Sequence, residues 1–159
     1  MSGKVHEKKG KQEQFQHARD NAIASIGKVV MYQQLLIKQN PEMAGQITKY
    51  WIDQLPITHD VEEAQMQYKF LSEFVLEQPE YILTADPTGT AQQIAKIVGE
   101  CFEEKYFAEP AHKLLMAEAV RYLSERAPGP VQESFKSACQ NVLSTEAQGH
   151  VQAAYNFRG

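Results

Sequence analysis

Residues 50–64 have the sequence YWIDQLPITHDVEEA, and this stretch ends one predicted helix and starts the next. Before Pro56, apolar residues recur at steps of three and four, the spacing of one face of a helix. Pro56 ends that helix, because its ring clashes with the preceding turn and it has no N–H to donate. Asp60 suits the N-cap of the next helix, and Glu63 follows three residues later, as a capping box requires. The stretch therefore predicts two amphipathic helices that meet at a short corner, one joint in a stack of helical hairpins.

Similar start and stop signals predict helices along the rest of the chain. Asn40-Pro41 and Pro110 are start signals, since proline is favoured at the first helical position. Turn-forming residues interrupt the apolar pattern at 86–90 and 128–130. No stretch has the pattern of a strand. The predicted helices cover residues 13–36, 41–54, 60–78, 91–105, 110–126, 131–143 and 145–155.

Three of these helices carry informative apolar patterns. The helix at 60–78 has apolar residues on two sides, so we expect neighbours on two sides. Gly27 costs about 1 kcal/mol relative to alanine in a helix interior, and close packing by another helix is the expected reason for it. Trp51 shares a stripe with Ile47 and Leu55, which favours a core position. The first helix carries one stripe of Phe15, Ala18, Ala22, Ile26 and Val29, which Ile23 and Val30 widen.

The helices pair in order as three hairpins that start near residues 13, 60 and 110. This spacing lies just above the ~40–47 residues of HEAT and armadillo repeats. The predicted fold is all-α: a right-handed α-solenoid of about three HEAT-type hairpins plus a C-terminal capping helix. Residues 1–12 are predicted as a flexible basic tail, and residues 13–159 as a single HEAT-repeat domain.

The bulk composition argues against several classes of function. The net charge of −4 lacks the basic footprint of non-specific nucleic-acid binding, although it is compatible with a basic partner. No apolar run approaches the roughly 18 residues of a membrane span, so membrane insertion is not expected. Cys101 and Cys139 have neither metal-ligand spacing nor a disulfide framework around them, which favours a reducing, intracellular compartment.

A search for chemistry gives only weak candidates. Glu109-x-x-His112 has the spacing of a di-iron ligand pair, but Pro110 places it at a helix start and no second pair exists. Glu146 and His150 lie one turn apart, and surface pairing explains them as well as a metal would. Cys101 lies on an apolar stripe, as expected of an inert buried thiol. We therefore expect no catalytic residue, cofactor or metal, and a protein that is not an enzyme.

Two tracts resemble a known family. Residues 20–31 (DNAIASIGKVVM) and residues 51–71, which begin WIDQLPITHDVEEA, resemble the C-terminal HEAT repeats of karyopherin-β (importin-β-like) nuclear transport receptors, closest to the beta-3 branch. There, too, a small-residue helix that contains asparagine precedes a Trp–Leu-Pro–acidic corner. The resemblance covers residues 13–105. It implies a helical-repeat scaffold in which the second helix of each hairpin lines a concave, partner-binding surface.

The resemblance also implies partners and a location. Protein cargo with basic import signals would bind the concave helices, and the receptor would shuttle between cytoplasm and nucleus through the nuclear pore. Full receptors of this family are several times longer, so the resemblance implies that the chain is a C-terminal fragment. In the family, Ran GTPase binds mainly N-terminal repeats, which would be missing from such a fragment. The predicted partner-binding residues are Gln46, Lys49, Asp53, Gln93, Lys96, Glu100, Glu103 and Glu104.

Alternative interpretations stay open at this stage. Glu100, Glu103 and Glu104 could form only a solvated helix face, or they could attract lysine- and arginine-rich cargo in a salt-sensitive way. The chain could be a purely structural HEAT segment whose first helix packs on upstream repeats. The least favoured alternative is a helical-bundle metal protein.

Overall fold

The computed structural model describes residues 2–32, 39–80 and 85–159. These residues form an all-α fold, and no strand occurs among them. The predicted all-α class is therefore confirmed. The helices are α1 (Ser2–Tyr32), α3 (Pro41–Gln54), α4 (Val61–Glu77), α6 (Pro87–Cys101), a 3₁₀ turn η1 (Glu104–Tyr106), α7 (Pro110–Arg121), a π-helical turn η2 (Tyr122–Arg126), α8 (Gly129–Asn141) and α9 (Thr145–Asn156).

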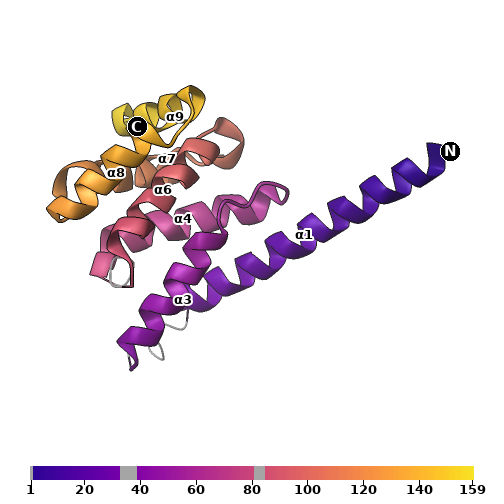
Figure 1. The fold of residues 1–159 in the computed structure, drawn as a ribbon, viewed down its shortest axis with the longest axis horizontal. Helices are drawn as coiled ribbons and strands as arrows, with labels where there is room; N and C mark the ends of the chain where they lie inside the picture. The colour runs from indigo at the N-terminus through magenta and orange to yellow at the C-terminus, as the bar shows by residue number, and fades with distance from the viewer. Residues whose placement is uncertain (1, 33–38, 81–84) are drawn as a thin grey trace.

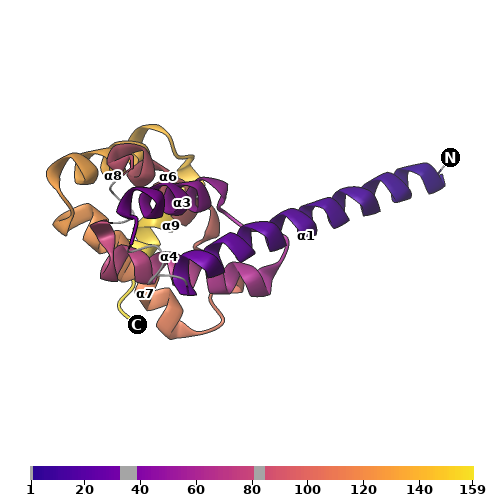
Figure 2. The same cartoon turned by 90° about the horizontal axis from the view of Figure 1, so that it is seen from below.

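The helices lie in two layers (Figures 1 and 2). In one layer, α4 packs against α1 on one side and α7 on the other. In the second layer, α6 packs between α3 and α8. α9 packs on α6 and α7 at the C-terminal end. The N-terminal half of α1 extends away from this body, and the N-terminus lies far from α9 (Figure 1).

Local capping signals explain where most helices begin. Asn40, Asp60, Asp86 and Ser144 each accept a hydrogen bond from the backbone N–H three residues later. Such bonds satisfy donors that a helix start would otherwise leave unpaired. The predicted starts at Asn40-Pro41, Asp60, Pro110 and Ser144 are confirmed.

Other predicted boundaries need correction. α1 begins at Ser2 rather than near Glu13, so residues 2–12, predicted as a tail, are helical. Its predicted end at Leu36 lies outside the described residues. α6 begins at Pro87, within the stretch 86–90 predicted as a turn, and not at residue 91. It ends at Cys101 instead of reaching Lys105, and the chain turns through η1. The division into a tail and one domain stays a prediction.

The core lies between the two layers of helices. Its largest fully buried side chains include Trp51, Tyr68, Phe135, Ile94 and Met116. α4 buries residues on two sides, against α1 and α7, which confirms the prediction of two neighbours. Trp51 is buried as predicted. No described helix combines the length and apolar character that a membrane crossing requires.

α1 buries only one edge of its predicted apolar stripe. Its buried residues are Asp20, Ile23, Ala24, Gly27 and Val30, which lie toward α3 and α4. In the predicted stripe, Ile26 is half-buried and the remaining members, Phe15, Ala18, Ala22 and Val29, are exposed. Ile23 and Val30, which were predicted to widen the stripe, are buried. They pack inward together with Asp20, Ala24 and Gly27, and α4 approaches α1 closely at Gly27 through Gln67.

Candidate binding surfaces

The α3–α4 corner is held by a carboxylate from α1. Asp20, which is almost fully buried, accepts hydrogen bonds at Oδ2 from the backbone N–H groups of His59 (2.9 Å) and Asp60 (3.0 Å). Asp60 in turn accepts from the Glu63 N–H at 3.1 Å. In a capping box the Glu63 side chain would accept from the Asp60 N–H. Here Asp20 does so instead, and Glu63 pairs with Lys28 of α1 at 3.0 Å.

A buried hydrogen-bond chain joins the same three helices. The Trp51 indole N–H donates to Gln67 Oε1 at 2.8 Å, and Gln67 Nε2 donates to the Ala24 carbonyl at 3.3 Å. A Cβ on Gly27 would lie 1.9 Å from Gln67 Oε1 and 2.6 Å from Trp51 Nε1. Gly27 is therefore explained by close packing, as predicted. This chain of polar groups serves the fold and is closed to ligands.

Tyr68 completes the corner from the other side of α4. Its hydroxyl donates to the Ile57 carbonyl at 2.5 Å, just after the cis Leu55–Pro56 peptide bond. Burial is the main cause that raises the pKa of the Tyr68 phenol far above its usual range, so the phenol stays a donor. Its ring packs edge-on against Tyr106 of η1. η1 therefore lies against α4, beside the corner.

The predicted binding residues on α3 form a polar outer face. Gln46 and Asp53 are exposed, and Lys49 is half-buried beside them. Lys49 Nζ donates to Asp53 Oδ2 at 2.5 Å. This hydrogen bond is the main cause that raises the pKa of Lys49. The pair lies at the surface, where such pairs contribute about 0–1 kcal/mol.

The predicted residues on and after α6 have different roles. Gln93 Nε2 donates to the carbonyls of Leu55 (3.0 Å) and Ile52 (3.5 Å), so it ties α6 to the end of α3. Lys96 and Glu100 are exposed on α6. Glu104 pairs with Lys113 of α7. The predicted acidic group is thus divided, because η1 turns Glu104 away from Glu100 and Glu103.

Glu100 and Glu103 line an open pocket of about 430 Å³ between α6 and α9. Its acidic side chains are Glu100, Glu103 and Glu146, and its wall includes Thr58 and His59 of the α3–α4 corner. Lys105, also in the wall, lies 3.6 Å from Glu103 Oε2. His150 Nδ1 lies 2.7 Å from the Gly99 carbonyl, which fixes its ring at the rim. We call this site the acidic pocket.

Sequence reasoning found only part of this pocket. Glu100 and Glu103 were predicted binding residues, whereas Glu146, His150 and His59 were not assigned to this surface. Glu146 and His150 carry one signal in the sequence, their one-turn spacing, which places both on one face of α9. Nothing in the sequence indicates that this face meets α6, which lies more than 40 residues earlier in the chain.

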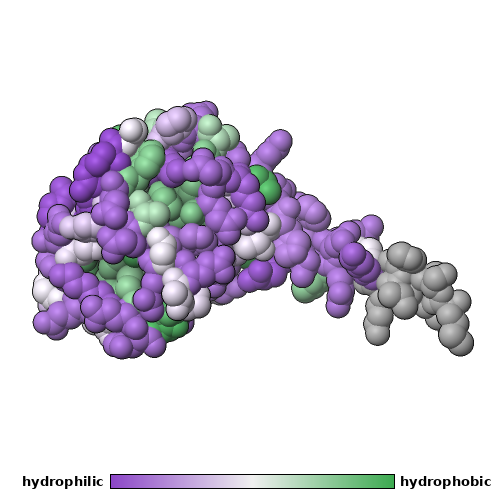
Figure 3. Space-filling model, turned by 90° about the horizontal axis from the view of Figure 1, so that it is seen from above, coloured by the Kyte–Doolittle hydropathy of each residue, from purple (hydrophilic) through white to green (hydrophobic). Residues whose placement is uncertain are grey.

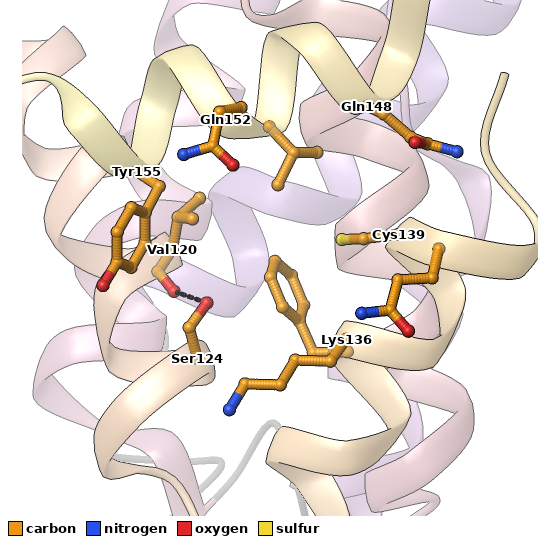
Figure 4. A pocket seen from close by; sticks show the side chains of 10 residues that line it. Val120, Ser124, Lys136, Cys139, Gln148, Gln152 and Tyr155 are labelled. Atoms are coloured by element: carbon orange, nitrogen blue, oxygen red, sulfur yellow. Dashed lines mark hydrogen bonds between the residues drawn. The ribbon is translucent and has the colours of Figure 1, made fainter. Parts of the chain in front are cut away.

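A second open groove, of about 230 Å³, lies between α7, η2, α8 and α9 (Figure 4). Val120, Phe135 and Val151 contribute apolar lining, and glutamines from α8 and α9 contribute polar lining. The space-filling view from the side of α9 shows apolar surface within a hydrophilic surround on the body (Figure 3). Cys139 lines this groove, and burial raises the pKa of its thiol. A protonated thiol is a poor nucleophile, so the groove lacks an activated group.

The remaining sequence candidates do not converge on a reactive site. Cys101 is fully buried, and burial raises the pKa of its thiol well above the usual value. Glu109 and His112 form a surface pair with 3.4 Å between Oε2 and Nε2. In the part of the chain that the structure describes, no group of three or more His, Cys, Asp or Glu side chains is arranged to hold a metal ion.

Three comparisons bear on the family of this chain. No model of a known protein family matches it, no curated protein matches it, and no solved structure matches it.

Proposed function

We propose that this protein is a non-enzymatic protein-binding scaffold whose acidic pocket holds a lysine- or arginine-rich segment of a partner. The observation that carries the proposal is the convergence of Glu100, Glu103 and Glu146 from two parts of the fold on one open pocket. Carboxylates accept charge-assisted hydrogen bonds from ammonium and guanidinium groups. The wall contributes one cation, Lys105, on an exposed side chain that can move aside.

The scaffold is proposed to be a right-handed α-solenoid of HEAT-type hairpins capped by α9. Two layers of helices stacked as α1–α4–α7 and α3–α6–α8 support this arrangement, since each hairpin then packs on the next. The resemblance of residues 20–31 and 51–71 to karyopherin-β receptors supports the same arrangement. On this proposal the chain is part of a nuclear import receptor that shuttles between cytoplasm and nucleus, and the basic segment is an import signal of protein cargo.

The test is binding of a fluorescent lysine-rich import peptide, followed by anisotropy at low and high salt. Reversing two carboxylates with Glu100→Lys and Glu146→Lys should weaken binding at least about tenfold, because each lost charged hydrogen bond contributes about 1.5–3 kcal/mol. High salt should weaken binding to the unmodified chain, because it screens exposed charges.

The matched control reverses two exposed carboxylates elsewhere, Glu77→Lys on α4 and Glu133→Lys on α8. This variant has the same net charge as the pocket variant, and it should bind nearly as well as the unmodified chain. Equal losses in both variants would show that only the overall charge matters, and binding unaffected by salt and by either variant would remove the pocket from the proposal.

A second proposal is a purely structural helical-repeat segment. The observation that favours it is the exposed apolar stripe of α1, since a stacked hairpin at a free end leaves one face uncovered. A folded chain that binds no basic peptide in the same assay would favour this alternative.

A further inference from the structure

The exposed face of α1 carries a regular seam. Its residues are separated by alternating steps of three and four, which is the a/d spacing of a coiled coil. Phe15 is 71% exposed, Tyr32 is 70% exposed, and Val29 is 48% exposed. Between them lie small, exposed residues. The whole seam consists of Phe15, Ala18, Ala22, Ser25, Val29 and Tyr32.

Most of the seam points away from the body of the protein, and Tyr32, at its end, also packs its ring edge-on against Phe70 of α4. At about 100° per residue, its members lie opposite Asp20, Ala24 and Gly27, the buried residues that face α3 and α4. α3 adds two exposed apolar side chains, Met43 and Tyr50, on the side opposite its buried residues. Both helices of this end of the protein therefore present exposed apolar side chains, which on α3 lie beside polar ones.

The projecting half of α1 also lacks the packing that normally stabilises a helix. Residues 11–15 and 17–19 are all exposed, and the helix extends beyond the body in Figure 1. Most helical stability in proteins comes from packing of an apolar face rather than from helix propensity. A partner along the seam, which begins at Phe15, would supply such packing on the side of α1 that the body leaves uncovered.

We propose that this face binds a second copy of the chain through an antiparallel pair of α1 helices. The seam is complementary to itself in this orientation. Phe15 of one copy meets Tyr32 of the other, Ala18 meets Val29, and Ala22 meets Ser25. Small side chains at the centre let the helix axes approach to the lower end of the about 8–10 Å range of packed helices, while the aromatic residues close both ends.

The residues beside the seam and the exposed apolar area of this face are consistent with such a dimer. Gln14 and Asn21 border one side of the seam and are uncharged, so the two helices do not repel each other there. With about 200 Å² for a fully exposed aromatic side chain, Phe15, Tyr32 and Tyr50 together expose roughly 400 Å² per copy. When Val29 and Met43 are included, the exposed apolar area of two copies together reaches the roughly 1,000 Å² that a specific interface buries.

Light scattering coupled to gel filtration tests the proposal over a concentration series. The unmodified chain should reach a mass of twice 18.0 kDa. Ala22→Glu should return it to a monomer with the same helical circular dichroism, because it places two like charges where the copies approach most closely. Ala153→Glu, an equivalent change at an exposed position of α9, should leave the dimer intact. A chain that stays at 18.0 kDa throughout, or an Ala22→Glu variant that stays dimeric, overturns the proposal.

Cysteine cross-linking tests the orientation. In a Cys139→Ser background, a mixture of Ala18→Cys and Val29→Cys chains should form cross-linked heterodimers on mild oxidation. Neither variant should cross-link efficiently by itself, since the two equivalent positions are far apart along antiparallel helices. Efficient cross-linking of Ala18→Cys chains to each other would contradict the antiparallel pairing.

Discussion

At the residue scale, a few buried polar contacts determine how closely the helices can approach. Gln67 uses both ends of its amide: the oxygen accepts from Trp51 and the nitrogen donates to the Ala24 carbonyl. The amide occupies the space that a side chain at position 27 would need. A buried polar group costs free energy unless it is paired. The Trp51 indole therefore needs the Gln67 amide as its acceptor, and the amide fits there only because residue 27 is glycine.

Gly27→Ala should therefore destabilise the protein. The added methyl group must displace Gln67 and leave buried donors unpaired, at a cost of about 1–3 kcal/mol per group. This cost outweighs the gain of about 1 kcal/mol in helix propensity. Urea unfolding followed by circular dichroism measures the change.

The control for this prediction is Gly149→Ala, in the exposed part of α9. A Cβ at position 149 meets no atom within 4 Å. The higher helix propensity of alanine is then the one effect of the change, so this variant should be up to about 1 kcal/mol more stable than the unmodified chain. Stabilisation by both substitutions would show that the space at Gly27 is not filled as described.

At the element scale, α1 and α4 are connected by side chains that act across the corner. The N-cap of α4 is local, since Asp60 accepts from its own helix. The backbone N–H of Asp60 is satisfied from α1, through Asp20. Because Asp20 accepts from the Asp60 N–H, the Glu63 side chain instead forms an ion pair with Lys28 of α1. The start of α4 is thus stabilised partly by its own sequence and partly by a helix about forty residues earlier.

Asp20→Ala should lower the free energy of unfolding by about 1–3 kcal/mol for each N–H group that loses its acceptor. Both the His59 and the Asp60 N–H groups lose one. Asp20→Asn keeps one carbonyl oxygen and should cost less. Chemical denaturation of both variants measures this order, and an Asp20→Ala chain as stable as the Asn variant would contradict the assigned role.

At the scale of the whole molecule, the two layers create surfaces that no single helix carries. Glu100 and Glu103 follow one another along α6 and its end, but Glu146 reaches them only because α9 packs back on α6. In the same way, the end face of α1 and α3 is exposed because α4 and α6 cover only its other side. Both proposed binding surfaces are properties of the stack.

Small-angle X-ray scattering should show an extended particle. A compact domain of this length has a radius of gyration of about 15 Å. α1 alone, with 31 residues, is about 46 Å long and projects from the body. The monomeric Ala22→Glu variant should therefore exceed the compact value clearly. A radius near 15 Å would show that α1 folds back onto the body.

The sequence by itself determined the all-α class and most helix starts, because the signals are local. Asn40, Asp60 and Ser144 each bond to an N–H three residues away, and the period of the apolar residues identifies a helix without knowledge of its neighbours. It also predicted that Gly27 and Trp51 are packing positions. Only the tertiary structure decided which side of α1 is buried and that Asp20 accepts hydrogen bonds at the start of a distant helix. It also decided that Glu146, and not Glu104, lines the acidic pocket with Glu100 and Glu103. These outcomes depend on which helices approach each other. α1 has apolar residues on two sides, and its own sequence does not specify which side its neighbours will cover.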